Sequence, residues 1–500
     1  MWFHLAVLAL LAAAYWVRQR LSYWQRRGVA FVEPSFPQGN LGGLGKTRHM
    51  SQVLQACYDQ LKGRGPFGGV HFFINPVALL IDLDLVKAVL VKDFASFHDR
   101  NLYHNDRDDP LSRHLVAMEG AKWKNLRAKL TPTFTSGKMK LMFSTVTTVA
   151  EEFTRCLTGE IVGTGRVEMK DLLARFTTDV IGTVAFGLEC NSLKDTNARF
   201  RVMGRKVFEP SRYRAIKNFL ASQFPQIART LRVTLTPAEI TDFFMGVVKD
   251  TIRFRETNDV QRNDFMTLLM KVMKEDVLSG KGSGSGDDQL TMDDIAAQAF
   301  VFFLAGFETS STTMSFCLYE LALHQELQEK ARANIDEVLK KHNTINYEAV
   351  HEMKYIEMCI NESLRKYPPA TTLTRKANQD YRVPGTEHVL TKGLMVAVPV
   401  YAIHHDPAHF PDPERFDPER FCPEQTAQRH PFAFLQFGEG PRICIGLRFG
   451  MMQARIGLVY LLKHFRFTLD ERKMSGPLKL SPSSSVLTID GGLWLNVEKL

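Results

Sequence analysis

One cysteine stands in a loop that could hold it in a reactive state. The stretch FGEGPRICIG covers residues 437–446 and places Cys444 between Arg442 and Gly446, with two further glycines earlier in the loop. Glycine lets the backbone turn sharply and approach a flat or bulky partner. Backbone amides, the positive end of a helix predicted to begin near Gly446 and the charge of Arg442 would each favour thiolate over thiol.

A stabilised thiolate can act as a nucleophile, a redox thiol or a metal ligand. A nucleophile would need a nearby base, and the loop contains no histidine. A redox thiol usually works with a second cysteine, of which Cys422 is the nearest in the sequence. Zinc needs several protein ligands, whereas a haem iron needs only one axial thiolate because the porphyrin fills the plane. The loop therefore favours a haem ligand, with a buried structural cysteine as the alternative.

The stretch AGFETS, residues 305–310, brings polar groups into an apolar helix. Gly306 costs a buried helix about 1 kcal/mol but leaves room for a small ligand beside the backbone. Glu308 and Thr309 follow it directly. Proton delivery is one interpretation, and a helix kink or a hydrogen-bonded core threonine is the other.

Two helical pairs could bind or balance charge. Trp123 and Arg127 are four residues apart, so that an indole N–H and a guanidinium on one face could hold one carboxylate. An ordinary surface helix would also explain that spacing. Glu362 and Arg365 are three apart and can form an ion pair, which on a surface would contribute under ~1 kcal/mol.

Together these motifs resemble those of the cytochrome P450 monooxygenases. The pattern F-x-x-G-x-R-x-C-x-G, which resembles the haem-binding signature of that family, is filled by Phe437, Gly440, Arg442, Cys444 and Gly446. Gln436 replaces a proline that often precedes the phenylalanine. W-x-x-x-R, A-G-x-[DE]-T-[TS] and E-x-x-R occur in the family's order. The amino-acid sequences of residues 99–115 and of the cysteine loop are most similar to those of insect microsomal members of family 6, which handle foreign compounds and hormones.

The resemblance implies a role for each residue. Cys444 would be the axial ligand of haem b, iron protoporphyrin IX. Thr309 and Glu308 would deliver protons. The remaining haem-binding residues would be Phe437, Arg442, Gly446, Trp123, Arg127 and Arg375. The pair of Glu362 and Arg365 would be buried and locked by Arg420 from the second P-E-R-F tetrapeptide, with Arg415 from the first as the reserve.

The activity implied is insertion of one atom of dioxygen into apolar small molecules, either xenobiotics such as insecticides and plant toxins or endogenous hormones and lipids. Electrons would come from an NADPH-dependent cytochrome P450 reductase, with cytochrome b5 as a further candidate partner. Lys122, Lys124, Lys129 and Arg448 are candidates for the docking face. The alternatives are a haem-thiolate isomerase or dehydratase that needs no reductase, and a non-catalytic haem binder.

The elements that must position these residues are mainly helical. The chain has 500 residues, of which 45% are hydrophobic and 23% charged, as expected for a globular protein with a large core. Helical periodicity prevails, Thr291 and Asp294 form a helix start signal, and residues 292–339 form one or two long helices. Short β-like pieces at 68–74, 389–399 and 485–497 predict small peripheral sheets. The pocket walls are expected to include the Phe-rich region 205–245.

The N-terminus predicts a membrane anchor. Residues 1–17 are apolar apart from His4 and precede Arg18 and Arg20. Because the positive charge follows the apolar run, it favours an uncleaved anchor over a signal peptide and leaves the body in the cytosol. The expected organisation is an anchor at 1–20, a basic and proline-containing hinge at 21–44, and a single haem-binding monooxygenase domain at 45–500.

Net charge and cysteine spacing indicate which partners and which cellular location to expect. The net charge is +9, and its basic residues are spread along the chain, which favours a membrane lipid surface or an acidic partner over nucleic acid. The seven cysteines are widely and irregularly spaced, so that neither a disulfide framework nor a zinc site is indicated. The expected location is the endoplasmic reticulum membrane, the source of microsomes.

Overall fold

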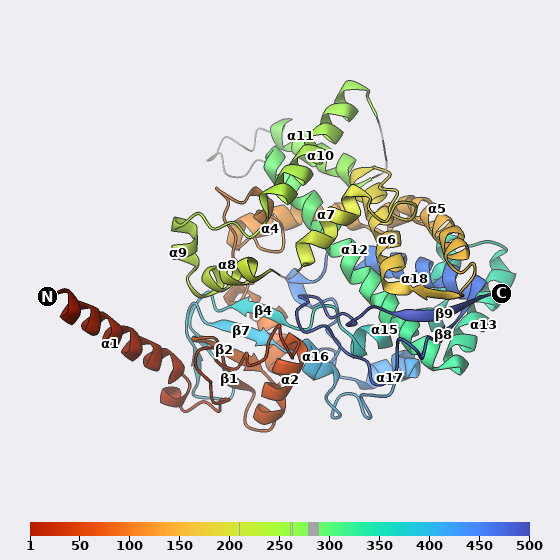
Figure 1. Cartoon of the computed structure of the whole chain (residues 1–500). Coiled ribbons are helices and arrows are strands. Elements are labelled where there is room, and N and C mark those ends of the chain that lie inside the picture. Colours follow the sequence, from red (N-terminus) through yellow and green to blue (C-terminus); the bar gives the residue numbers. More distant parts are fainter. Residues whose placement is uncertain (210, 261, 263, 279–289) are drawn as a thin grey trace.

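The computed structural model describes residues 1–209, 211–260, 262, 264–278 and 290–500, and Figure 1 shows that helices dominate the fold. The prediction of a mainly helical body with small sheets is confirmed. The glycine-rich connector expected at 280–288 lies outside the described residues. The longer helices are α2 (Met50–Leu61), α4 (Gly120–Leu130), α5 (Ser136–Glu160), α6 (Met169–Ile181), α7 (Arg199–Phe208), α8 (Arg212–Gln223), α10 (Ala238–Thr257), α11 (Phe265–Leu278), α12 (Met292–Leu323), α13 (Gln325–His342), α15 (Lys354–Lys366) and α18 (Leu447–His464).

Shorter elements connect these helices. The short helices are α3 (Leu83–Lys87), α9 (Pro225–Thr230), α14 (Tyr347–Glu352), α16 (Val400–His404) and α17 (Pro423–Gln428). The strands are β1 (Phe67–Phe72), β2 (Asn75–Leu80), β3 (Arg166–Glu168), β4 (Leu373–Lys376), β5 (Tyr381–Arg382), β6 (Val389–Leu390), β7 (Met395–Val398), β8 (Phe465–Leu469) and β9 (Trp494–Lys499).

The central helix is α12, which passes through the middle of the body in Figure 1. It begins as the sequence predicts, because the Thr291 hydroxyl accepts from Asp294 N at 3.2 Å and Asp294 Oδ2 accepts from Thr291 N at 2.9 Å. The helix packs against α6, α15 and α18. It ends at His324, so residues 292–339 form two helices rather than one.

The largest sheet has the strand order β1-β2-β7-β4. β1 and β2 form an antiparallel hairpin, β2 runs parallel to β7, and β7 pairs antiparallel with β4, which sets Arg375 opposite Val396. The predicted β-pieces at 68–74 and 389–399 correspond to β1 and to β6 with β7. The predicted piece at 485–497 is correct only at its C-terminal end, because β9 begins at Trp494.

Two apolar cores meet at the cysteine loop. One lies among α5, α6, α12 and α18, and the other lies between the four-stranded sheet, α2 and α16. Leu435, at the start of the loop, belongs to the core of the sheet, whereas Phe449, just after it, belongs to the helical core. The loop is therefore held at both ends by packed side chains.

The predicted N-terminal helix is present as α1 (Trp2–Leu21), which projects from the body in Figure 1 and has no buried side chain. Among the described residues, however, no helix combines the length and the apolar character needed to cross a membrane. The expected hinge packs on the body, because Trp24 is 1% exposed and its indole N–H donates to Val70 O at 3.1 Å.

Candidate active site

The candidate site is a cavity of about 560 Å³ between α12, α4, β4 and the cysteine loop. Phe134, Phe265 and Phe302 form part of its apolar wall. Eight of the residues predicted from sequence line it: Trp123, Arg127, Thr309, Arg375, Phe437, Arg442, Cys444 and Gly446. The structure thus brings together residues from distant parts of the chain around one enclosed space.

Cys444 presents its side chain to this cavity. The side chain is accessible, and the space that it faces is the candidate cavity. Its backbone N–H donates to Phe437 O at 2.9 Å, which closes the loop. Helix α18 begins at Leu447, three residues after Cys444, with Gly446 as its N-cap.

Two glycines make the loop possible. Gly438 and Gly440 have φ of +70° and +75°, which L side chains rarely adopt. A Cβ on Gly440 would also lie 2.0 Å from Leu90 O. Gly446 has a φ of −89°, which is open to any residue. A Cβ at Gly446 would meet no described atom within 4 Å.

The surroundings of Cys444 act on its thiol in opposite directions. Burial raises the pKa of the thiol, and the Gly446 N–H, Arg100 and Arg127 offset this only partly. The cations that act on the sulfur are Arg100 and Arg127, whereas the sequence pointed to Arg442.

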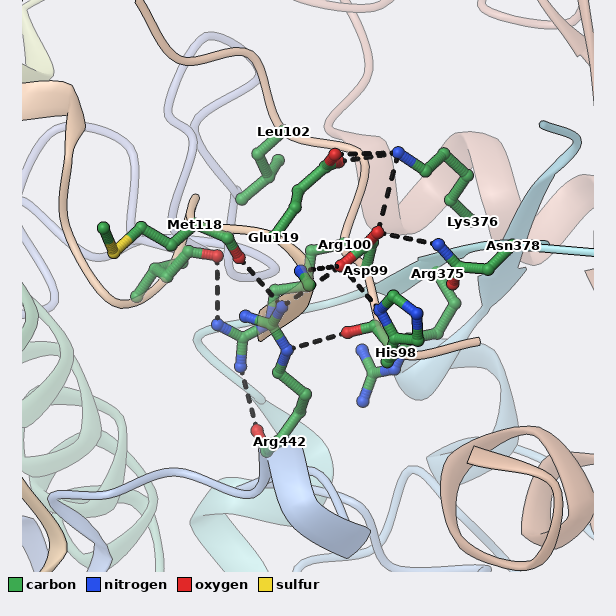
Figure 2. A network of polar contacts seen from close by, with 12 residues as sticks. His98, Asp99, Arg100, Leu102, Met118, Glu119, Arg375, Lys376, Asn378 and Arg442 are labelled. Carbon is green, nitrogen blue, oxygen red and sulfur yellow. Dashed lines mark hydrogen bonds and ion pairs between the residues drawn. The ribbon is translucent and has the colours of Figure 1, made fainter. Parts of the chain in front are cut away.

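Arg442 is instead occupied by backbone carbonyls. It is 2% exposed, and its guanidinium donates to His98 O at 2.9 Å, to Leu115 O at 3.3 Å and to Met118 O at 2.8 Å. It also lies 3.9 Å from the ring centroid of Trp123. Figure 2 shows Arg442 beside His98 and Met118. Its main contribution here is to fix the segment before α4 and to support the indole.

Three other arginines form the charged part of the wall. Burial lowers the pKa of Arg100 to about 10 and that of Arg375 to about 9, and repulsion from other arginines adds to the effect. Burial also lowers the pKa of Arg127. Arg375 Nη1 donates to Thr374 O at 2.8 Å, while its buried Nε has no hydrogen-bond partner in the part of the chain that the structure describes. These buried cations would gain from an anionic ligand.

Arg100 is the site residue that sequence reasoning missed. It lines the cavity, and its Nη2 donates to Arg442 O at 2.9 Å. It belongs to the stretch DRNLYHNDRDDPLSRHL, which carries a family resemblance but no pattern typical of a ligand-binding residue. A basic residue in an irregular loop has no periodicity, so only its spatial proximity to Cys444 marks it.

On α12, the two predicted polar residues differ in their position relative to the cavity. Thr309 lines the cavity, and its hydroxyl donates to Ala305 O at 2.5 Å. Glu308, by contrast, is not among the described residues that line the cavity. Gly306 does line it, but a Cβ there would lie 2.2 Å from Cδ1 of Ile181, so this glycine allows α6 to approach α12 closely.

The pair of Glu362 and Arg365 lies away from the cavity, and both side chains are fully buried. Arg365 donates to the two carboxylate oxygens at 2.8 Å each. Arg420 Nε lies 3.4 Å from Glu362 Oε1, whereas Arg415 contributes only its backbone carbonyl. Burial raises the pKa of Glu362, and Arg365 opposes that effect.

A buried histidine links this charged cluster to the cysteine loop. His404 accepts a hydrogen bond from Leu435 N at 2.8 Å, and its Nδ1 lies 3.1 Å from Arg365 O. Arg365 in turn donates to His404 O at 3.0 Å. The position of the loop is therefore coupled to the ion pair.

The expected pocket walls are wrong in one region. Phe243 and Phe244 pack in the helical core with rings 5.1 Å apart, and Phe208 packs 5.7 Å from Phe307. The phenylalanines expected at the wall from this region are Phe208, Phe219, Phe243 and Phe244, and none of them lines the cavity among the described residues. The wall is formed instead by phenylalanines of α12 and α11 and of the turn before α5.

The residues present suit a flat group with acidic substituents. One thiol faces the cavity, several buried arginines surround it, and one of them has an unpartnered N–H in the described part of the chain. A helical body with such a cavity is the class of fold and site that holds a prosthetic group behind a single cysteine ligand.

Comparisons with known proteins agree with this class. The family model for cytochrome P450 matches residues 33–495. The chain is 44% identical to cytochrome P450 6A1 of Musca domestica over 501 residues, covering 99% of this chain and 97% of that protein. It is also 44% identical to probable cytochrome P450 6a14 of Drosophila melanogaster over 488 residues, covering 96% of each. The chain belongs to the cytochrome P450 family and is an oxidoreductase of the monooxygenase type.

Proposed function

We propose that this chain is a haem-thiolate monooxygenase that oxidises apolar small molecules with electrons from an NADPH-dependent cytochrome P450 reductase. The observation that carries the proposal is the placement of Cys444 in a cavity lined by Arg100, Arg127 and Arg375. The family implies a haem cofactor, and the thiol and the arginines supply a ligand for its iron and partners for its carboxylates.

Each group of residues would have one task. Cys444 would hold the haem iron through its sulfur, and a haem held by a thiolate would supply the cleavage of dioxygen. Trp123, Arg127, Arg375 and Arg100 would hold the acidic substituents. Thr309 would hold and pass a proton at its hydroxyl oxygen, and the phenylalanine wall would exclude water and receive the substrate.

The substrate class rests on the apolar wall. Phe134, Phe265 and Phe302 pack with ring centroids 4.2 to 5.6 Å apart at the cavity. A surface of this kind gains free energy by burying apolar ligands and offers little to charged ones. Foreign compounds such as insecticides and plant toxins, and endogenous hormones or lipids, have this chemistry.

The remaining features concern organisation and partners. We propose that residues 45–500 form the haem-binding domain, with an attachment segment at 1–20 and a linking segment at 21–44. The exposed apolar side chains of α1 would contact the endoplasmic reticulum membrane and leave the body in the cytosol. Lys124 and Arg448 are exposed and could contact an acidic reductase surface. Cytochrome b5 would bind the same basic residues and would compete with the reductase for them.

One observation keeps the isomerase alternative testable. Glu308 does not line the cavity among the described residues, so the proton relay has only Thr309 facing the ligand. An isomerase or dehydratase would convert a peroxide substrate without reductase. Turnover of such a substrate that is independent of NADPH would favour this alternative.

The test is reconstitution with reductase, NADPH and haem, followed by a screen of steroids, fatty acids and toxins by product mass. We expect a product heavier by one oxygen and a carbon-monoxide difference spectrum typical of thiolate ligation. Cys444→Ser should lose that spectrum. A wild-type protein that binds no haem, or binds it through imidazole, would contradict the proposal.

A further inference from the structure

A buried carboxylate lies where the elements that carry the cavity arginines meet. Asp99 is 4% exposed and accepts hydrogen bonds from Gly120 N at 2.8 Å, from Asn378 Nδ2 at 2.7 Å and from His98 Nδ1 at 2.8 Å. Figure 2 shows these side chains converging on Asp99. Gly120 is the first residue of α4, and Asn378 follows β4. One carboxylate thus joins two elements that are far apart in the sequence.

The same carboxylate also faces two cations. Arg442 Nη2 lies 3.7 Å from Asp99 Oδ1, and Lys376 Nζ lies 3.7 Å from Asp99 Oδ2. Lys376 additionally contacts Glu119 at 2.8 Å, as Figure 2 shows. The backbone contributes too, since Lys376 N donates to Asp99 O at 2.8 Å.

These contacts join Asp99 to the elements whose side chains form the cavity wall. Helix α4 carries Trp123 and Arg127, strand β4 carries Arg375, and the cysteine loop carries Arg442. Asp99 itself does not line the cavity among the described residues, and its neighbour Arg100 does. Asp99 therefore touches each of these elements from outside the cavity.

The carboxylate is suited to remain charged. Burial by itself would raise the pKa of Asp99, but the hydrogen bonds from Gly120, His98 and Asn378 outweigh it and place the pKa below its ordinary value. Buried cations that lie close to one another need such a counter-charge, because their mutual repulsion is weakly screened.

We propose that Asp99 is the positioning residue of the cavity: its negative charge and its hydrogen bonds hold α4, β4 and the cysteine loop in the arrangement that binds a group with acidic substituents. The inference rests on the proposed function, which makes haem that group. Asp99 acts through Arg442 and α4 and does not itself touch the ligand.

The test compares Asp99→Asn with a matched carboxylate of the same segment. Asp93 accepts from the Tyr381 hydroxyl at 2.8 Å and makes no hydrogen bond or ion pair with the cavity arginines among the described residues, so Asp93→Asn is the control. Release of haem from the holoenzyme to a haem-scavenging globin is measured for each variant. We expect Asp99→Asn to release haem about tenfold faster, as is typical when a residue that orients a ligand is lost, and Asp93→Asn to match the wild type.

Two further readouts separate positioning from general stability. The reduction potential of bound haem should become more positive in Asp99→Asn, because one negative charge is lost beside the cavity, and Asp99→Glu should retain the wild-type potential. Hydrogen exchange of residues 98–120 in cofactor-free protein should quicken in Asp99→Asn alone. Equal haem release in Asp99→Asn and the wild type, or an unchanged potential despite faster release, would overturn the inference.

The outcome also distinguishes this inference from the proposed function. Wild-type protein that binds no haem contradicts the proposed function, and the hydrogen-exchange comparison then decides whether Asp99 orders the segment. Wild-type protein that binds haem while Asp99→Asn matches it in release and exchange contradicts only the role of Asp99.

Discussion

The guanidinium of Arg365 and the carboxylate of Glu362 form a two-bond ion pair, with both bonds 2.8 Å long and neither side chain exposed to solvent. Glu362 also accepts from Asp417 N at 2.9 Å and faces Arg420. Removing one charge from such a pair leaves the other buried without compensation, which costs about 3–5 kcal/mol.

Glu362→Gln should therefore lower the thermal midpoint strongly and reduce haem content, since His404 couples the pair to the cysteine loop. Scanning calorimetry and the absorbance of bound haem are the measurements. Glu348→Gln is the control, because its pair with Lys140 is exposed on both sides. A Glu362→Gln protein as stable and as rich in haem as that control would contradict the expectation.

Thr309→Ala should uncouple electron supply from product formation. Thr309 is the residue of the predicted relay that faces the cavity, so its loss removes a hydroxyl that can pass protons. The expected result is continued NADPH consumption with more hydrogen peroxide and less product. Thr309→Ser, which keeps the hydroxyl, is the control. Tight coupling in Thr309→Ala would show that another group delivers the proton.

Gly306→Ala should destabilise the contact between α12 and α6. The added Cβ would lie 2.2 Å from Cδ1 of Ile181, and overpacking of this kind costs about 1–3 kcal/mol. Adding Ile181→Ala removes the clashing atoms, so the double variant should be more stable than the sum of the single changes. Gly246→Ala on α10 meets no atom within 4 Å and should be neutral or stabilising. Strict additivity in thermal midpoints would count against the contact.

His405 should make stability fall as the solution is acidified. Burial lowers its pKa from 6.5 to about 3, and its Nδ1 lies 2.8 Å from Tyr401 O, while Arg365 and Lys366 disfavour its charged form. Below about pH 6.5 the unfolded chain takes up a proton that the folded chain refuses, so stability present at neutral pH is lost down to about pH 3.

The slope for one such proton is ~1.4 kcal/mol per pH unit. Thermal midpoints between pH 7.5 and pH 5 for the wild type and His405→Gln measure it, and the variant should show the shallower decline. His4→Gln, on exposed α1, should follow the wild type. Parallel curves for all three proteins would exclude His405 as a contributor.

The sequence was informative where a function depends on neighbouring residues. The cysteine loop, the spacing of Trp123 and Arg127 and the capping box at Thr291 are local patterns, and the structure places each where the pattern indicates. Arg100 and Asp99 could not be assigned in this way, because each has a partner far away in the sequence: Arg442 for Arg100 and Asn378 for Asp99. The role of Arg442 could not be assigned either, because a sequence motif does not show which backbone carbonyls accept its hydrogen bonds.

Phenylalanine shows a further limit. Its abundance predicted an apolar pocket, but composition does not distinguish a side chain that lines a cavity from one that fills a core. Phe244 is fully buried among other rings, and Phe302 lines the cavity, although both belong to Phe-rich stretches. The short strands β4 and β8 were missed because a few residues carry too little alternation to reveal a strand.

The hydrogen bond from Arg100 to the carbonyl of Arg442 joins positions 342 residues apart. A ribosome therefore has to synthesise most of the chain before both sides of the cavity exist. A polypeptide that stops short of residue 437 lacks one side of the cavity. We therefore expect a cofactor held there to be captured only late in synthesis or after it, so the yield of active protein should depend on the cofactor supply at that stage.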